Sequence, residues 1–193
     1  MKLIGSSTSP YVRRIRLLLA DAGQGYEFSD LNIYGEDRDE LRRQNPALKI
    51  PVLYDGGEVI YDSRVIFRYL QEKLGLAQIG WQQENLLTII DAANDSMVAI
   101  LLSQRSGLDT SEDRLFFNLQ RERVEKTLEA LERQVDEGAF NVWHYPSICL
   151  YSMFDWGLFR GLIDAARYPH LSAWLAEQKV RADVAGSDPR DAV

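Results

Sequence analysis

Small polar side chains stand at two places where a helix is expected to begin. Ser9 precedes Pro10 and an apolar pattern at helical spacing, a typical helix start because serine caps and proline tolerates the first position. Asp62 and Ser63 precede a second pattern of this kind. A side chain at a helix start either caps the helix or binds a ligand as well, and the residue types alone do not separate these roles.

Metal and disulfide chemistry find little support in the residue types. The chain has one cysteine, Cys149, which excludes an internal disulfide and any Cys-x-x-Cys redox or zinc site. Cys149 lies in an apolar segment, which favours an inert thiol. His144 and His170 are far apart and lack metal-ligand spacing, and His170 is interpreted as packing at a helix start. We therefore expect no bound metal.

The composition is typical of a soluble globular protein. Of the 193 residues, 46% are hydrophobic and 26% are charged. No stretch approaches the roughly 20 apolar residues that span a bilayer, and the first residues turn polar too soon for a signal peptide. The net charge of −7 argues against a nucleic-acid partner. We therefore expect a cytoplasmic protein with no membrane and no nucleic-acid partner.

Charge is distributed unevenly along the chain. Residues 1–77 contain 11 basic and 11 acidic side chains, whereas residues 78–193 contain 11 basic and 18 acidic ones. The second part therefore carries the whole net charge. This asymmetry predicts two units, of which the first would better receive an anionic ligand.

The first 77 residues alternate between strand and helix signals. Strand signals lie at residues 2–5, 26–33, 51–54 and 58–61. Helix signals lie from Pro10 to about Gly23, at the charged segment 36–43, and after Ser63. The glycines between the last two strands indicate a hairpin, and the first two strands should be parallel as in a βαβ unit. The order predicts a small mixed sheet with helices against its faces.

Strand signals stop after residue 77, and residues 75–83 look like a linker. Apolar residues then recur at helical spacing in four segments: 84–105, 112–136, Pro146 to about Leu162, and from Pro169 on. The polar tail after Arg181 is expected to be loose. We therefore expect an α+β chain with two domains, residues 1–77 and 84–193, the second all-helical.

Three segments in the first 80 residues resemble glutathione S-transferases of the bacterial cytosolic, serine type. They are Gly5–Arg13, Asn45–Leu53 and Tyr61–Ile66, and they occur in order at family-like separations. The middle one matches the family's Asn-Pro-x-x-Lys-Val/Ile-Pro-x-Leu pattern. The resemblance implies a thioredoxin-like N-terminal domain (βαβ-ββα) followed by a helical bundle. It also implies glutathione as co-substrate and a homodimer that packs the first domain of each subunit against the second domain of the other.

By resemblance, Ser9 matches the serine that keeps the thiol of glutathione as a thiolate beside an electrophile. A cysteine thiol titrates near about 8.5, so a dominant thiolate at pH 7 needs a pKa lowered by about two units, roughly 2.7 kcal/mol. A hydrogen bond to a charged group contributes about 1.5–3 kcal/mol, and a helix N-terminus about 0.3–1 kcal/mol. One hydroxyl therefore suffices without metal or general base. Ser6, Ser7 and Thr8 are rivals, because the sequence does not exclude a small offset.

The resemblance also implies five glutathione-binding residues: Lys49, Ile50, Pro51, Asp62 and Ser63. Pro51 matches a cis-proline that turns the backbone N–H and C=O of Ile50 toward glutathione, and the alternative is a trans proline that opens an edge strand. Ser63 and its neighbouring amides would bind the γ-glutamyl carboxylate at a helix N-terminus, and Asp62 its ammonium region. Lys49 would pair with the glycyl carboxylate, or remain a solvated lysine. Many relatives have Glu in place of the shorter Asp62.

A pocket for the electrophile is expected between the domains, with Tyr11, Met97 and Leu101 as candidates that are more often plain core. We expect an enzyme that conjugates glutathione to a small hydrophobic electrophile, or a related glutathione-dependent reaction, with a role in detoxification. The alternative is a non-catalytic binding or regulatory protein on the same scaffold. The retained site residues favour the enzyme. A thiol-disulfide oxidoreductase is disfavoured because no cysteine lies at the first helix start.

One helix start departs from the family pattern. Relatives begin the third helix of the second domain with a Ser/Thr-x-x-Asp capping box, whereas the aligned residues here are His144-Tyr145-Pro146-Ser147. Pro146 is expected in the first turn, with Tyr145 or His144 at the cap. This departure predicts an effect on stability and none on the chemistry.

Overall fold

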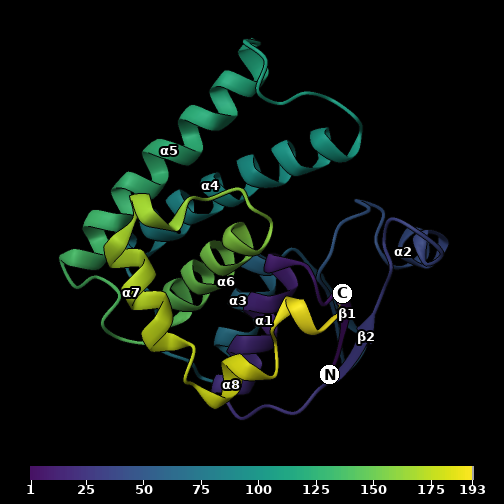
Figure 1. Ribbon diagram of the computed structural model, residues 1–193. Helices are drawn as coiled ribbons and strands as arrows, with labels where there is room; N and C mark the ends of the chain where they lie inside the picture. Colours follow the sequence, from purple (N-terminus) through teal and green to yellow (C-terminus); the bar gives the residue numbers. More distant parts are fainter. Residues whose placement is uncertain (193) are drawn as a thin grey trace. The chain divides into compact units, whose positions relative to one another are not determined.

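The computed structural model describes residues 1–192, which form two compact units (Figure 1). The first unit comprises Met1–Gln78 together with the chain from Arg181 on, and the second comprises Ile79–Val180. The sequence-based division put its boundary near residue 77, and the N-terminal part of the first unit ends at Gln78. The C-terminal tail differs, because it was expected in the helical domain and instead packs with the first unit.

A four-stranded sheet forms the centre of the first unit, in the order β2-β1-β3-β4. Its strands are β1 (Lys2–Gly5), β2 (Glu27–Asp30), β3 (Val52–Asp55) and β4 (Glu58–Tyr61). β1 is parallel to β2, and β3 is antiparallel to both β1 and β4. Gly56 and Gly57 join β3 to β4 with φ values of 57° and 99°, and two positive values are what a type I′ turn needs. The βαβ unit and the hairpin are thus confirmed.

Helices cover both faces of this sheet (Figure 1). α1 (Pro10–Asp21) and α3 (Ser63–Lys73) pack together on one face, and α2 (Arg38–Gln44) lies on the other. Side chains alternate along β1, so Leu3 is fully buried on one face while Ile4 packs with Leu31 and Val52 on the other.

The C-terminal segment is held against α1. It forms α8 (Ala182–Ala185) and the 3₁₀ helix η2 (Pro189–Ala192). Nε of Arg13 donates to Oγ of Ser187 at 3.1 Å, and Nη2 of Arg16 donates to the carbonyl oxygen of Gly186 at 2.9 Å. The prediction of a loose tail was therefore wrong, because long-range hydrogen bonds from α1 hold a segment that carries little apolar signal.

The second unit is helical throughout its regular structure. It contains α4 (Trp81–Arg105), α5 (Leu115–Asp136), α6 (Tyr145–Phe159), the 3₁₀ helix η1 (Ala165–Arg167) and α7 (Pro169–Gln178). Residues 145–157 of α6 are all buried, as expected for a helix that is apolar on every side. α4 and α7 pack against it, and α5 packs against both α4 and α7.

α4 is long and apolar enough to cross a membrane by length and composition alone. Its most apolar window has a mean hydropathy of 1.5, and 39% of that window is buried inside the structure. The core helix of a soluble protein passes the same test. Leu87, Ile90, Ala93 and Met97 of α4 are each fully buried, so the apolar character of this helix is explained by packing within its own unit.

Candidate functional site

One edge of the sheet gathers the predicted glutathione-binding segments. The strand register pairs Ile4 with Val52 and Val52 with Tyr61, so the ends of β1 and β4 and the start of β3 lie at the same edge. The loop into α1, the segment before β3 and the first turn of α3 therefore all leave the sheet there. These three segments carry the six predicted residues Ser9, Lys49, Ile50, Pro51, Asp62 and Ser63.

Ser9 caps α1 through a long hydrogen bond. Its Oγ accepts from the backbone N–H of Val12 at 3.4 Å, and the helix begins at Pro10 as predicted. A hydroxyl that accepts in this way uses one lone pair and keeps its proton for another partner. Ser9 can therefore cap the helix and donate to an anion in front of it at the same time, so the two interpretations of this residue are compatible.

The neighbouring hydroxyls are engaged differently. Oγ of Ser7 donates to Asp30 at 2.6 Å, and the backbone N–H of Ser7 donates to the same carboxylate at 2.9 Å. Oγ of Ser6 and Oγ1 of Thr8 are 3.2 Å apart, so one donates to the other. The proton of Ser7 is therefore committed to Asp30, whereas that of Ser9 remains available.

Gly5 allows the first turn of α1 to lie close to β1. A Cβ atom at this position would lie 2.4 Å from Cγ2 of Val12. Valine is stiff about χ1 and gives way little. A side chain at position 5 would therefore displace the start of α1, and Ser9 with it, from the edge of the sheet.

Asn45 folds the segment that carries Lys49. Its side chain is buried, its Nδ2 donates to the carbonyl oxygen of Lys49 at 2.7 Å, and its Oδ1 accepts from the N–H of Ala47 at 2.9 Å. Sequence reasoning gave Asn45 no role, although Asn-Pro is a turn signal that could have suggested one. The Lys49 side chain is exposed, and the Ile50–Pro51 peptide bond is cis, as the resemblance implied.

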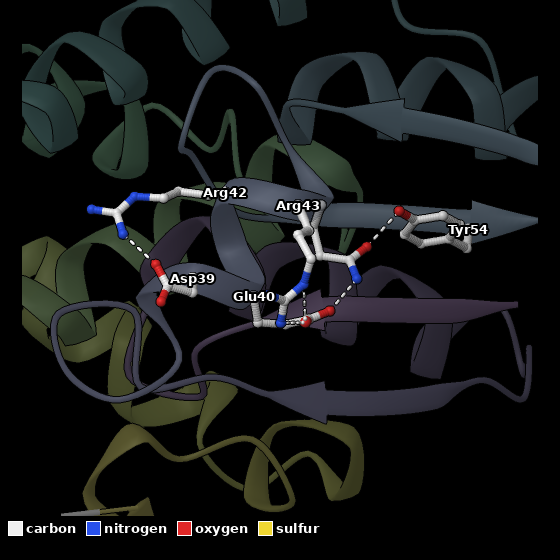
Figure 2. Close-up of polar contacts among 6 residues, drawn as sticks. Asp39, Glu40, Arg42, Arg43 and Tyr54 are labelled. Carbon is white, nitrogen blue, oxygen red and sulfur yellow. Dashed lines mark hydrogen bonds and ion pairs between the residues drawn. The ribbon is translucent and has the colours of Figure 1, made fainter.

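A chain of polar contacts ties the end of α2 to β3 (Figure 2). The hydroxyl of Tyr54 donates to Oε1 of Gln44 at 2.5 Å, and Nε2 of Gln44 donates to Glu40. Glu40 also accepts from Arg43. Hydrogen bonds from Gln44 and Arg43 lower the pKa of Glu40 below its ordinary value. This network holds α2 in place immediately before Asn45.

α3 begins with Asp62 in an unusual conformation. Asp62 has φ 70° and ψ 134°, a region that residues other than glycine seldom adopt. Its side chain caps the helix by accepting from the N–H of Arg64 at 2.8 Å, which confirms the predicted cap. Backbone strain of this kind clusters at functional sites. Ser63, 4% exposed, follows as the first helical residue.

The electrostatics of this edge favour anions. The first turns of α1 and α3 contain no acidic side chain. Each helix start therefore carries a partial positive charge, which the carboxylate of Asp62 offsets in part at α3. Lys49 adds a full positive charge from the segment before β3. A ligand with two carboxylates and a thiolate suits this combination.

The three candidates for an electrophile pocket are divided between the two units. Tyr11 lies in the first turn of α1, with the guanidinium carbon of Arg14 5.0 Å from its ring centroid. Met97 of α4 is fully buried, and a Cβ atom added at Gly157 of α6 would lie 3.0 Å from its sulfur. Leu101 is half-buried. Their part in an electrophile pocket stays a prediction.

The two histidines lie at helix starts, and the cysteine lies in the core. His144 is the N-cap of α6, and its Nδ1 accepts from the N–H of Ser147 at 3.2 Å. Burial lowers the pKa of His144. His170 lies in the first turn of α7, where its backbone N–H donates to Oε1 of Glu132 at 2.7 Å. Cys149 is buried. Within residues 1–192, no group of three or more His, Cys, Asp or Glu side chains is placed to hold a metal ion.

Comparison with known proteins links these features to one family. Residues 3–77 match the family model described as glutathione S-transferase, N-terminal domain. The chain is 32% identical over 148 residues to an uncharacterised GST-like protein, YibF, of Escherichia coli, covering 72% of this chain and 71% of that one.

A solved structure and a more distant relative add to this. A glutathione transferase family member from Pseudomonas fluorescens, crystallised with bound glutathione, is 26% identical, covers 97% of this chain and 98% of its own, and superimposes with a TM-score of 0.81. The N-terminal region is also 36% identical over 75 residues to a stringent starvation protein A homolog of Haemophilus ducreyi, covering 38% of this chain and 34% of that one.

Proposed function

Because the chain belongs to the glutathione S-transferase superfamily, we propose that it binds glutathione at this edge of the sheet and joins its sulfur to a small hydrophobic electrophile. The observation that carries the proposal is the state of Ser9. Its oxygen caps α1 while its proton stays available, at the start of a helix whose first turn lacks acidic residues. This is the arrangement that a thiolate needs.

In the proposed reaction, the thiol of bound glutathione loses its proton to solvent and the thiolate accepts a hydrogen bond from Ser9. The sulfur lone pair then forms a bond to an electrophilic carbon. In a substitution, the leaving group departs with the electrons of the broken bond. The Ser9 hydrogen bond and the α1 N-terminus lower the pKa of the thiol, so no general base on the protein is required.

The rest of glutathione is proposed to bind along the same edge. The γ-glutamyl carboxylate binds Ser63 and the N-terminus of α3, with Asp62 toward the ammonium group. The backbone of Ile50, next to Pro51, pairs with the peptide backbone of glutathione. Lys49, carried by the turn that Asn45 folds, pairs with the glycyl carboxylate.

The test is turnover with glutathione and an activated aryl halide. Ser9→Ala should lower kcat/KM by about 10–100-fold if the hydrogen bond contributes about 1.5–3 kcal/mol in the transition state. Ser6→Ala, Ser7→Ala and Thr8→Val serve as matched variants that each remove one hydroxyl. Unchanged turnover in Ser9→Ala, with a large loss in one of the other three, would move the role to that residue.

A non-catalytic binding or regulatory protein on the same scaffold is the second candidate. The N-terminal region is similar to a stringent starvation protein A homolog, a relative whose name states no transferase activity. This candidate predicts glutathione binding without turnover of any electrophile, or no binding at all. A screen of chemically varied electrophiles against the wild type separates the two candidates.

A homodimer is part of the proposal. Each unit exposes a group of apolar side chains: Val59, Tyr61 and Val65 on the first, and Leu115, Phe116 and Leu119 on the second. Exposed apolar patches mark interaction surfaces, and both groups are proposed to take part in the dimer interface. Light scattering should give twice the mass of one chain, and Phe116→Asp should lower it. A role in detoxification and a cytoplasmic location remain proposals.

A further inference from the structure

A groove in the helical unit shares no residue with the proposed glutathione site. It has a volume of about 550 Å³ and is lined by α4, α5 and the segment from Leu162 to Tyr168. Its apolar lining consists of Ile100, Val124, Leu128, Leu162 and Ile163. Pockets for small molecules measure roughly 300–1,000 Å³. The groove therefore has the size of a site for a small organic molecule.

Tyr168 places a polar group in the wall of this groove. The side chain is 4% exposed, and its hydroxyl forms no hydrogen bond with any side chain or backbone group that the structure describes. Burial raises the pKa of Tyr168, which keeps the hydroxyl neutral at pH 7. The ring is buried, whereas the hydroxyl oxygen keeps some access to solvent, so it can bond to a molecule that enters the groove. A ligand in the groove could supply the partner.

Two arginines, Arg121 and Arg167, lie at the rim of the groove. Arg167 is paired with Glu125. Arg121 donates to the backbone carbonyl oxygens of Thr110 and Glu112 and to the side chain of Asn118. Both guanidinium groups of the rim therefore already have acceptors.

Two acidic side chains of the rim, Glu122 and Asp164, form fewer hydrogen bonds and ion pairs than the arginines do. Glu122 forms no hydrogen bond or ion pair among the described residues, although its charge helps to raise the pKa of Lys126. Asp164 accepts one backbone N–H, that of Ala166, at 3.1 Å. The unit around them is acidic, since residues 79–180 contain 15 Asp and Glu against 9 Lys and Arg. The local and the overall charge thus favour a cation.

We propose that this groove binds a small organic cation, an ammonium group carried on an apolar body. The ammonium group pairs with Glu122 and Asp164 at the rim, and the apolar body lies on the floor. The hydroxyl of Tyr168 accepts an N–H bond from the ammonium group. This ligand satisfies the acidic rim, the Tyr168 hydroxyl and the apolar lining together, whereas an organic anion would meet the carboxylates of the rim.

The experiment uses the full chain and two probes, a naphthylethylamine and its neutral isostere, a naphthylethanol. Binding is followed by calorimetry and naphthyl fluorescence. The amine should bind at one site per chain and more tightly than the alcohol. Glu122→Gln should weaken amine binding by about threefold to tenfold, as expected for a partly exposed charge-assisted hydrogen bond, and leave the alcohol unaffected.

Matched controls make the outcome specific. Glu177→Gln removes the same charge from the same unit at a residue outside the groove and should change nothing. Tyr168→Phe should weaken the amine, and Ser63→Ala should leave it unchanged. Equal affinity for the two probes, no effect of Glu122→Gln, or an equal effect of Glu177→Gln would overturn the proposal. None of these results depends on whether the chain is a transferase.

Discussion

Replacing Ser9 by alanine should raise the pKa of the thiol of bound glutathione. The hydroxyl proton of Ser9 is free to reach the sulfur because its cap uses a lone pair of the oxygen. A hydrogen bond to a charged group contributes about 1.5–3 kcal/mol, which corresponds to about one to two pKa units. We expect a rise of that size in Ser9→Ala.

The same substitution should do little to the fold. The cap bond from Val12 is long, at 3.4 Å, and a lost N-cap costs about 0.5–2 kcal/mol, so a value at the low end is expected here. For a chain of this size, about 1 kcal/mol lowers the melting temperature by about 2–4 °C. The change in thiol pKa would therefore be measured on a folded enzyme.

This pKa is measured from the thiolate absorbance of the glutathione complex as a function of pH, and independently from the pH profile of kcat/KM. The matched control is Ser7→Ala, because the proton of Ser7 is committed to Asp30. Wild type and Ser7→Ala should share a lowered thiol pKa, and Ser9→Ala should not. An unchanged pKa in Ser9→Ala, or an equal rise in both variants, would refute the assignment.

Three further predictions concern the scaffold. Burial lowers the pKa of His144, so the folded state binds a proton less readily than the unfolded state, and the stability present above about pH 6.5 should fall as the pH decreases. Urea unfolding at pH 5 and pH 7.5 should show a larger loss of stability for the wild type than for His144→Ser, whose cap does not titrate. Equal losses would contradict this prediction. Gly5→Ala should destabilise by about 1–3 kcal/mol and weaken glutathione binding, because the new methyl group would overlap Val12; a folded variant with unchanged stability would show that α1 adjusts freely. Ser187→Ala removes the acceptor of Nε of Arg13 and should cost about 1–3 kcal/mol in urea unfolding, whereas the exposed Ser106→Ala should cost far less.

Features that depend on neighbouring residues could be predicted from the sequence. β1 has the expected limits, Ser9 and Pro10 begin α1, and the two glycines form the turn between β3 and β4. Each is decided by local backbone preference. The cap at His144 was one of two alternatives, and the structure confirms it.

Features that depend on distant residues could not be predicted. β2 was expected over residues 26–33 but covers Glu27–Asp30, because its length is set by pairing with β1. Asp30 contacts Ser7 across 23 residues, and Ser187 contacts Arg13 across 174. No local sequence pattern predicts such contacts. The contact between Ser7 and Asp30 nevertheless fixes the loop before Ser9, and the contact between Arg13 and Ser187 holds the C-terminal tail.

The most direct test of the central claim is calorimetry of glutathione binding at pH 7 with millimolar ligand. The account predicts saturable binding by the wild type and affinity at least several-fold weaker in Ser63→Ala, at the buried start of α3. It predicts no such change in Ser106→Ala. Absence of binding by the wild type would mean that Ser9 and Asp62 serve only as helix caps and Ser63 only as the first residue of α3, and would contradict the proposed function.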